Sequence, residues 1–392
     1  MRRALVPLLV LAALAAGITL GGHPDLLPGF VRDALVGDQD TRVVREAIEK
    51  VADDYYRAIP ERELADAAVR GVVSSLDDRF SNYLDPKEYQ RFQDVTHSQY
   101  AGVGMEVVQV KAGLRVVTTY DGSPARRAGI EQGDIITAVN GESLAGKAAA
   151  RGSDKIKGPP GTPVKLSVRH HGVERVLTVT RARVTVPVVA SRLRTVDGKK
   201  LGVVRLATFS SGAHGEVDAA LTKLDQRGAK GFVFDLRGNG GGLVSEAQLI
   251  ASAFLKGGTV VSTRGRSVTS QTLKAIGDPV VPTAPVVVLV DHDTASASEI
   301  VTGALQDRGR AKVVGVPTFG KGVFQQILDL SNGGALDITA GQYFTPNGRN
   351  LGGQGVKTGA GIKPDIEARD VRKTARDEAL DKALDVLAAE VR

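Results

Sequence analysis

The sequence predicts a multidomain α/β protein, in which an N-terminal helical region and an inserted β-rich domain precede a core with a mixed, mostly parallel sheet and helices. Three observations predict this fold class. Apolar residues recur at helical spacing over residues 41–76, at strand spacing over residues 100–183, and in alternating strands and helices after Arg183. Alternation of strands and helices favours a mostly parallel sheet that helices cover on both faces.

The composition limits the class of protein. The chain has 392 residues, enough for two or three domains, and it is 42% hydrophobic and 24% charged, which is typical of globular proteins. Its net charge of +7 is spread along the chain, so we expect a solvated surface of mixed charge and no nucleic-acid partner. Cysteine is absent, which excludes disulfides, cysteine-ligated metals and a thiol nucleophile. We expect no cofactor and no metal.

The first 37 residues predict export. Met1-Arg2-Arg3 is positively charged, and residues 4–20 are mostly apolar and carry no charge. This pattern fits a signal peptide or an N-terminal membrane anchor, with a linker up to residue 37. A buried core helix fits less well, because the segment is apolar on nearly all faces. We therefore expect an extracytoplasmic protein, either secreted or anchored at the outer face of the cytoplasmic membrane.

The next two regions differ in their hydrophobic period. Residues 38–96 are expected to form the helical region, because apolar residues recur there every three or four positions. Residues 97–184 are expected to form the β-rich domain, with a short helix after Ser123-Pro124 and with strands predicted at residues 107–110, 114–117, 135–140, 164–168 and 176–179.

Residues 185–368 are expected to form the α/β core, and residues 369–392 a C-terminal helix. The core strands are predicted at residues 201–206, 231–236, 286–290 and 311–316. The helices between them are predicted at residues 215–226, 245–255 and 298–307.

A serine-rich turn, Thr294-Ala-Ser-Ala-Ser-Glu-Ile300, lies between a strongly apolar strand and a helix. Backbone N–H groups at a helix N-terminus favour a developing oxyanion, so a serine here could be a nucleophile. An ordinary helix N-cap explains the same pattern. His292 is the histidine rival for a base, although a solvated loop histidine is the plainer interpretation.

Lys321 is expected to return to this turn. A helix of about ten residues rises roughly 15 Å, and the following strand of six residues covers about 20 Å in the opposite direction. Apolar neighbours could desolvate the lysine there, lower its pKa and make it a general base, whereas a solvated surface lysine is the alternative. The loop from Gly315 to Gly322 nearly matches a phosphate-binding P-loop, but Gly322 replaces the Ser or Thr that holds magnesium.

Two glycine-containing loops complete the set of candidates. The stretch from Gly238 to Gly242 follows an apolar strand, and backbone without Cβ atoms can approach a substrate there or simply form a tight turn. The loop Gly102-Val103-Gly104-Met105 precedes a predicted strand. Backbone N–H groups in such a loop can capture a peptide carboxylate while the peptide adds to the sheet as a strand.

Together these residues resemble the C-terminal processing proteases, also called tail-specific proteases or carboxyl-terminal peptidases, which carry a PDZ domain. The resemblance covers roughly residues 41–366 and consists of motifs in the family's order. These are Asn82-Tyr-Leu-Asp-Pro86, the PDZ signature around Gly102 and Ser123, Asp235-Leu-Arg-Gly-Asn-Gly-Gly-Gly242, Ala295-Ser-Ala-Ser-Glu-Ile300, Gly303-Ala-Leu-Gln-Asp307, Phe319-Gly-Lys-Gly322 with Gln325, Tyr343-Phe-Thr-Pro-Asn-Gly348 and Gly361-Ile-Lys-Pro-Asp365.

The resemblance implies a serine endopeptidase that cuts proteins near their C-termini. Within it, Ser296 matches the nucleophile, Lys321 the general base and Gln325 the residue that orients the lysine. The N–H groups of Ala297 and of Gly241 or Gly242 match the oxyanion hole, and Asp307 matches a supporting acidic position. The PDZ loop, Gly102 to Met105, would bind unfolded or flexible protein C-termini, while an adaptor or self-association stays open.

Two departures from the family pattern and two other function classes remain. Thr294 and Gly240 replace a common serine and a common proline, and neither position carries the chemistry.

A non-enzymatic PDZ scaffold that binds C-termini is the first alternative. A nucleotide-dependent protein that uses the loop from Gly315 to Lys321 is the second.

Overall fold

The computed structural model describes residues 39–146, 149–353, 355–371, 374 and 376–391. The described residues form two compact units, one that ends at Asp85 and one that begins at Pro86. The apolar segment at residues 4–20 lies outside the described residues, so the expected signal peptide or anchor stays a prediction. Among the residues that are described, no helix is both long enough and apolar enough to span a membrane.

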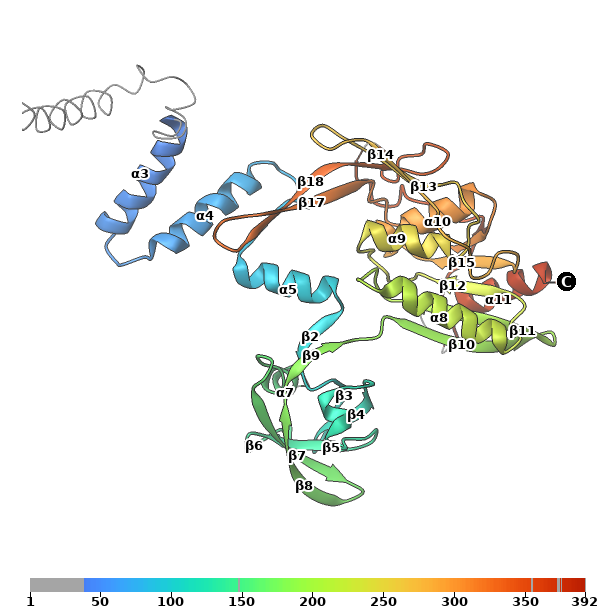
Figure 1. Cartoon of the computed structure of the whole chain (residues 1–392), viewed down its shortest axis with the longest axis horizontal. Coiled ribbons are helices and arrows are strands. Elements are labelled where there is room, and N and C mark those ends of the chain that lie inside the picture. The colour runs from blue at the N-terminus through green and yellow to red at the C-terminus, as the bar shows by residue number, and fades with distance from the viewer. Residues whose placement is uncertain (1–38, 147–148, 354, 372–373, 375, 392) are drawn as a thin grey trace, which may run out of the picture. The chain divides into compact units, whose positions relative to one another are not determined.

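The first unit contains helices α3 (Gln39–Asp54) and α4 (Glu61–Ser74) (Figure 1). The short strand β1 (Asn82–Leu84) follows them. The segment after α4 folds back onto that helix. The Tyr83 hydroxyl donates to Asp66 at 2.6 Å, and Arg70 forms an ion pair with Asp85 at 3.1 Å. These contacts fix the turn that ends the unit.

The second unit begins with helix α5 (Pro86–Thr96) and continues into the β-rich domain. Its elements are β2 (Gln99–Gly102), β3 (Met105–Val110), β4 (Gly113–Thr119), α6 (Pro124–Arg127), β5 (Ile135–Val139), β6 (Glu142–Ser143), α7 (Ala149–Ile156), β7 (Pro163–His170), β8 (Val173–Thr180) and β9 (Ala182–Thr185).

The main sheet of this domain is antiparallel, with the strand order β3-β4-β5-β7-β8, and β6 pairs with β5. Strand β3 therefore lies at one edge of the sheet. In β7, Val164, Leu166 and Val168 are buried while the residues between them are more exposed, as the two-residue period of a strand requires. Strands β2 and β9, which enter and leave the domain, pair with each other.

The α/β core follows. Its elements are β10 (Val189–Val196), β11 (Lys199–Leu206), α8 (Ala213–Gln226), β12 (Phe232–Asp235), α9 (Val244–Ser252), β13 (Thr259–Gly265), β14 (Gln271–Lys274), β15 (Val286–Val290), α10 (Ala297–Asp307), β16 (Lys312–Gly315), β17 (Val323–Asp329), β18 (Ala335–Phe344), β19 (Ile366–Glu367) and α11 (Glu378–Glu390).

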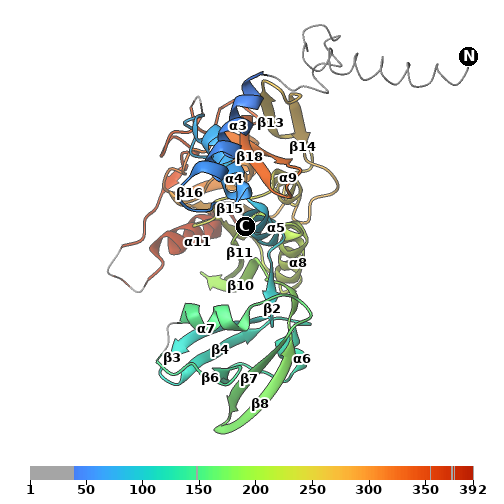
Figure 2. The same ribbon diagram turned by 90° about the vertical axis from the view of Figure 1, so that its left-hand side faces the viewer.

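The central sheet has the order β10-β11-β12-β15-β16-β19. Strands β10 and β11 pair in antiparallel fashion, and the remaining neighbours pair in parallel. Helix α11 lies on one side of the central sheet, and α8 and α9 lie on the other (Figure 2). Phe232 and Phe234 pack with residues of α8, α9 and α10, whereas Val233 packs with residues of α11. Burial on both faces explains the continuous apolar runs in β12 and β15.

A second core sheet is antiparallel and joins β14, β13, β18 and β17. No strand is predicted from the sequence at these segments, because the side chains of β14 and β18 do not alternate between buried and exposed positions. Among the named strands of the described residues, the parallel pairs all lie in the central sheet. The predicted domain limits at residues 96, 184 and 368 stay predictions.

Candidate active site

Ser296 lies between β15 and α10 in a strained backbone conformation. Its φ and ψ are 57° and −116°, and its relative exposure is 7%. A residue other than glycine with positive φ outside the left-handed helical well costs on the order of 1–3 kcal/mol and persists only where its surroundings enforce it. The turn therefore presents this side chain at the carboxyl end of the sheet and at the start of a helix.

Glu299 is the group that holds the serine turn. Its side chain is fully buried, and its Oε2 accepts a hydrogen bond from the Ser296 N–H at 2.8 Å. The same oxygen accepts the Lys321 N–H at 3.0 Å, and Oε1 accepts the Gly320 N–H at 2.8 Å and the Thr318 hydroxyl. Burial raises the pKa of Glu299, while these hydrogen bonds favour its carboxylate form.

Sequence reasoning missed Glu299, although a signal was present. Ser296-Ala-Ser-Glu299 has the spacing of a capping box, in which the glutamate side chain reaches back to the N-cap N–H. That spacing indicates the bond to Ser296 but not the bonds to Gly320 and Lys321. Those depend on how the loop after β16 returns.

Lys321 and Gln325 are joined by a side-chain hydrogen bond. The lysine Nζ donates to Gln325 Oε1 at 2.7 Å, and Gln325 Nε2 donates to the Thr339 hydroxyl on β18 at 3.3 Å. An extended strand would separate these Cα atoms by about 13 Å. The pairing of β17 with β18 shifts register between Phe324 and Gln325, and such an irregularity bends a strand and redirects its side chains.

A cavity of about 420 Å³ contains Ser296, Lys321 and Gln325 in its wall. Gly240 and Gly242 line it as well. Most of the remaining wall is apolar and comes from Phe92, Val95, Phe209, Leu243, Val244, Ile327 and Tyr343. Ser296, Lys321 and Gln325, the three predicted catalytic residues, therefore line one cavity whose remaining wall is mostly apolar.

Tyr343, which the sequence analysis did not single out as a site residue, lies beside the serine. It is 2% exposed, and its ring packs against Phe324 with the ring centroids 5.4 Å apart. Burial raises the pKa of Tyr343, and the nearby Ser296 hydroxyl opposes that rise. The phenol is therefore neutral, and it lines the same cavity as Ser296.

The glycine-rich turn lies directly against the serine turn. A Cβ atom built on Gly241 would lie 2.8 Å from Ala295 O, 2.9 Å from Ala297 N and 2.9 Å from Ser296 Cβ. The Gly241 N–H donates to Asn239 Oδ1 at 2.9 Å, and Asn239 O accepts the Ala295 N–H at 3.0 Å. Glycine is required at position 241 because the two turns approach so closely.

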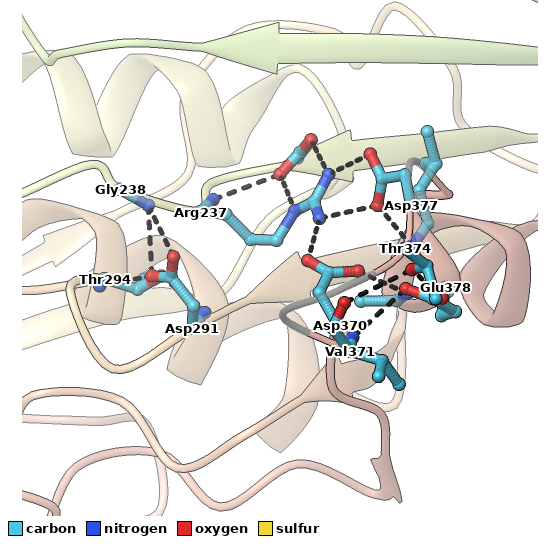
Figure 3. A network of polar contacts seen from close by, with 12 residues as sticks. Arg237, Gly238, Asp291, Thr294, Asp370, Val371, Thr374, Asp377 and Glu378 are labelled. Carbon is cyan, nitrogen blue, oxygen red and sulfur yellow. Dashed lines mark hydrogen bonds and ion pairs between the residues drawn. The ribbon is translucent and has the colours of Figure 1, made fainter.

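A charged network holds the start of this turn (Figure 3). Arg237 bonds both oxygens of Asp377, the N-cap residue of α11, at 2.7 and 3.0 Å, and it also pairs with Asp235 and Asp370. The next residue, Gly238, donates its N–H to Asp291 at 3.0 Å. Its acidic partners raise the pKa of Arg237 despite its burial, so the guanidinium stays charged.

Asp307 lies at the end of α10, away from the cavity wall. Its side chain is 3% exposed, accepts the Asn347 N–H at 2.9 Å and pairs with Arg349. These contacts hold the loop after β18, the strand that carries Tyr343. Asp307, predicted as a supporting acidic residue, therefore contacts the loop after β18.

The predicted peptide-binding loop, Gly102 to Met105, leads into edge strand β3. Beside it is a second cavity of about 320 Å³. This cavity is lined by Tyr100, Val103, Met105, Glu106, Val107, Tyr120, Ser153, Ile156 and Lys157. An apolar groove at a sheet edge suits an extended peptide with an apolar end.

Comparisons with known proteins agree with this architecture. The family model for peptidase family S41 matches residues 200–368, and a PDZ domain model matches residues 115–170. A carboxy-terminal-processing protease of Bartonella bacilliformis is 35% identical over 328 residues, which cover 82% of this chain and 73% of that protein. The carboxy-terminal processing protease CtpA of Bacillus subtilis is 31% identical over 353 residues, which cover 89% of this chain and 74% of that protein.

A solved structure, the photosystem II D1 C-terminal processing protease, is 29% identical to this chain with a TM-score of 0.50, covering 89% of this chain and 97% of that one. The fold and the matches define a serine-type peptidase with a PDZ domain. Within that class, the chain belongs to the carboxy-terminal processing protease family. The family resemblance found in the sequence is confirmed.

Proposed function

We propose that this protein is a serine endopeptidase that cuts proteins near their C-termini, with Ser296 as nucleophile and Lys321 as general base. The observation that carries the proposal is the shared carboxylate oxygen of Glu299, which accepts the backbone N–H groups of both residues. Through it the two side chains reach the same cavity. A Ser–Lys pair is one of the known alternatives to a Ser–His pair.

In the proposed reaction, the neutral amine of Lys321 takes the Ser296 hydroxyl proton as Oγ attacks the scissile carbonyl. The resulting ammonium then gives that proton to the leaving amine when the C–N bond breaks. Water attacks the acyl-enzyme in the second half, and Lys321 takes a proton from the water and returns one to Ser296. Gln325 orients the amine through its Oε1 acceptor.

The oxyanion of each tetrahedral intermediate needs N–H donors next to Ser296. We assign this role to the Ala297 N–H at the start of α10 and to a glycine of the adjacent turn. Gly242 lines the cavity, whereas the Gly241 N–H donates to Asn239. Of the two glycines, Gly242 is therefore the proposed donor, and Gly241 provides the close approach.

The PDZ domain is proposed to select substrates by binding unfolded or flexible C-termini at the loop from Gly102 to Met105. Edge strand β3 and the apolar groove beside it support this role. We also propose that the protein works outside the cytoplasm, as the positive and apolar residues at its N-terminus predict.

The alternatives predict different chemistry. A nucleotide site would need the N–H groups of the loop before Gly322 to face phosphates, but the Gly320 and Lys321 N–H groups donate to the buried carboxylate of Glu299. A scaffold without enzyme activity would need neither the strained turn at Ser296 nor the lysine–glutamine hydrogen bond.

The test is incubation of the purified full chain with an unfolded protein that ends in an apolar residue, followed by mass spectrometry of the fragments. We expect fragments from the unsubstituted protein and none from Ser296→Ala or Lys321→Ala, with all three folded by circular dichroism. Cleavage by either variant at the full rate would refute the assignment. Peptide binding without cleavage by the unsubstituted protein would favour the scaffold.

A further inference from the structure

Tyr100 folds back onto the loop that is proposed to bind the carboxylate. It lies on β2, opposite Val184 of β9. A Cβ atom on Gly102 would lie 2.5 Å from Tyr100 Cε2, so the absence of a side chain at position 102 makes room for the tyrosine ring. The ring also lines the groove beside edge strand β3.

The hydroxyl of Tyr100 accepts a hydrogen bond from the Met105 N–H at 3.2 Å. Met105 ends the loop and begins β3. The Met105 N–H is one of the donors that a peptide carboxylate needs when a peptide adds to this edge. In this structure a phenol oxygen therefore takes the place of one carboxylate oxygen.

We propose that Tyr100 is an internal competitor for the carboxylate-binding loop, so that a substrate C-terminus binds only by displacing its hydroxyl. The inference rests on the proposed role of the PDZ domain. It adds that a ligand must bind the loop more strongly than the Tyr100 hydroxyl does. A carboxylate can win this competition, because hydrogen bonds to a charged acceptor are roughly twice as strong as those to a neutral one. Weak acceptors, such as an internal backbone carbonyl or a C-terminal amide, are at a disadvantage.

The charge state of Tyr100 agrees with this role. Burial raises the pKa of Tyr100, so the phenol stays neutral over the physiological range. A neutral hydroxyl satisfies the Met105 N–H in the unliganded domain without matching the strength of a carboxylate. The tyrosine therefore lowers affinity for all C-termini while keeping the empty loop hydrogen-bonded.

The experiment measures peptide binding by fluorescence anisotropy, with the full chain carrying Ser296→Ala so that the probe is not cut. The probe is a labelled peptide ending in Leu-Ala-Val with a free carboxylate, and its C-terminal amide is the second probe. Tyr100→Phe removes the competing hydroxyl and keeps the ring. Thr178→Val is the matched control, because it also removes one hydroxyl but lies exposed on β8, at the opposite edge of the sheet from β3.

We expect Tyr100→Phe to bind the free-carboxylate peptide about fivefold more tightly, the effect of roughly one net hydrogen bond. Thr178→Val should bind the peptide within about twofold of the protein that has Thr178. Equal or weaker binding by Tyr100→Phe, or an equal gain in both variants, overturns the competition. If the unsubstituted domain binds carboxylate and amide equally, recognition of C-termini itself is wrong, and the competition fails with it.

Discussion

Ser296 and Lys321 donate their backbone N–H groups to the same oxygen of Glu299, at 2.8 and 3.0 Å. Neither residue therefore sets its position alone. A buried carboxylate on the first turn of α10 ties the serine turn to the loop that carries the lysine. This bond pattern makes Glu299 the first residue to test after the nucleophile and the base.

Replacing Glu299 by glutamine keeps the size of the side chain but turns one acceptor oxygen into a donor. Since a hydrogen bond to a charged group contributes about 1.5–3 kcal/mol, we expect kcat to fall by roughly 10- to 100-fold. KM should change much less, because the substrate groove is untouched. Glu246→Gln is the control, as Glu246 is also buried and accepts the Gly212 and His214 N–H groups. An equal loss of kcat in Glu246→Gln would mean that Glu299 supports only the stability of the fold and does not position Ser296 and Lys321.

Substitution of Gln325 by glutamate should move the pH profile of activity to higher pH. A carboxylate beside Lys321 Nζ stabilises the ammonium, so a higher pH is needed to form the neutral base. The profile of kcat/KM from pH 5 to 10 measures this shift. Gln326→Glu makes the same charge change on the next residue of β17, which is exposed, and should leave the profile in place. An unshifted profile in Gln325→Glu would argue against a lysine base oriented by this residue.

The two neighbouring glycines of the turn predict opposite outcomes for the same substitution. Alanine at position 241 places a Cβ atom within 3 Å of the Ser296 turn at a φ of 102°, so we expect kcat/KM to fall by more than about 100-fold. Alanine at position 240 meets no atom within 4 Å and should retain nearly full activity. Thermal melting of both variants checks that they fold. Normal activity of Gly241→Ala would mean that the turn at Gly241 can move away from the Ser296 turn without loss of catalysis.

The ion pair between Arg237 and Asp377 predicts a pH-dependent stability. Burial alone would raise the pKa of Asp377, but hydrogen bonds from Arg237 and the Leu380 N–H, with the charge of Arg237, lower it below the ordinary value of 3.8. A lowered pKa in the folded state contributes stability above the unfolded value, and this contribution disappears as pH falls through the folded pKa. The difference in free energy of unfolding between the protein and Asp377→Asn should therefore shrink below about pH 4.

Urea denaturation between pH 6 and 2.5 measures this difference. We expect about 1 kcal/mol near neutral pH, a modest value because 41% of the Asp377 side chain is exposed. Asp385→Asn, on the same helix and exposed, serves as the control. A difference for Asp377→Asn that stays constant with pH would contradict the assignment.

Part of the site could be predicted from local pattern. The apolar run of β15, the serine-rich turn and the return of the chain through β16 were enough to expect Lys321 near Ser296. These inferences depend on helix rise, strand rise and hydrophobic period, which act over a few residues. The antiparallel sheet of β13, β14, β17 and β18 was missed, because residues of β14 and β18 do not alternate between buried and exposed positions and so give no clear two-residue period.

By itself the sequence determined the order of the domains, the family resemblance and the residues with the right chemistry at a strand-to-helix turn. The tertiary structure decided which of these groups share a hydrogen bond. Glu299 with Lys321, Gln325 with Thr339, and Tyr100 with Met105 are pairs of this kind. A buried polar group must find a partner, but which partner it finds depends on the segments that the fold brings beside it.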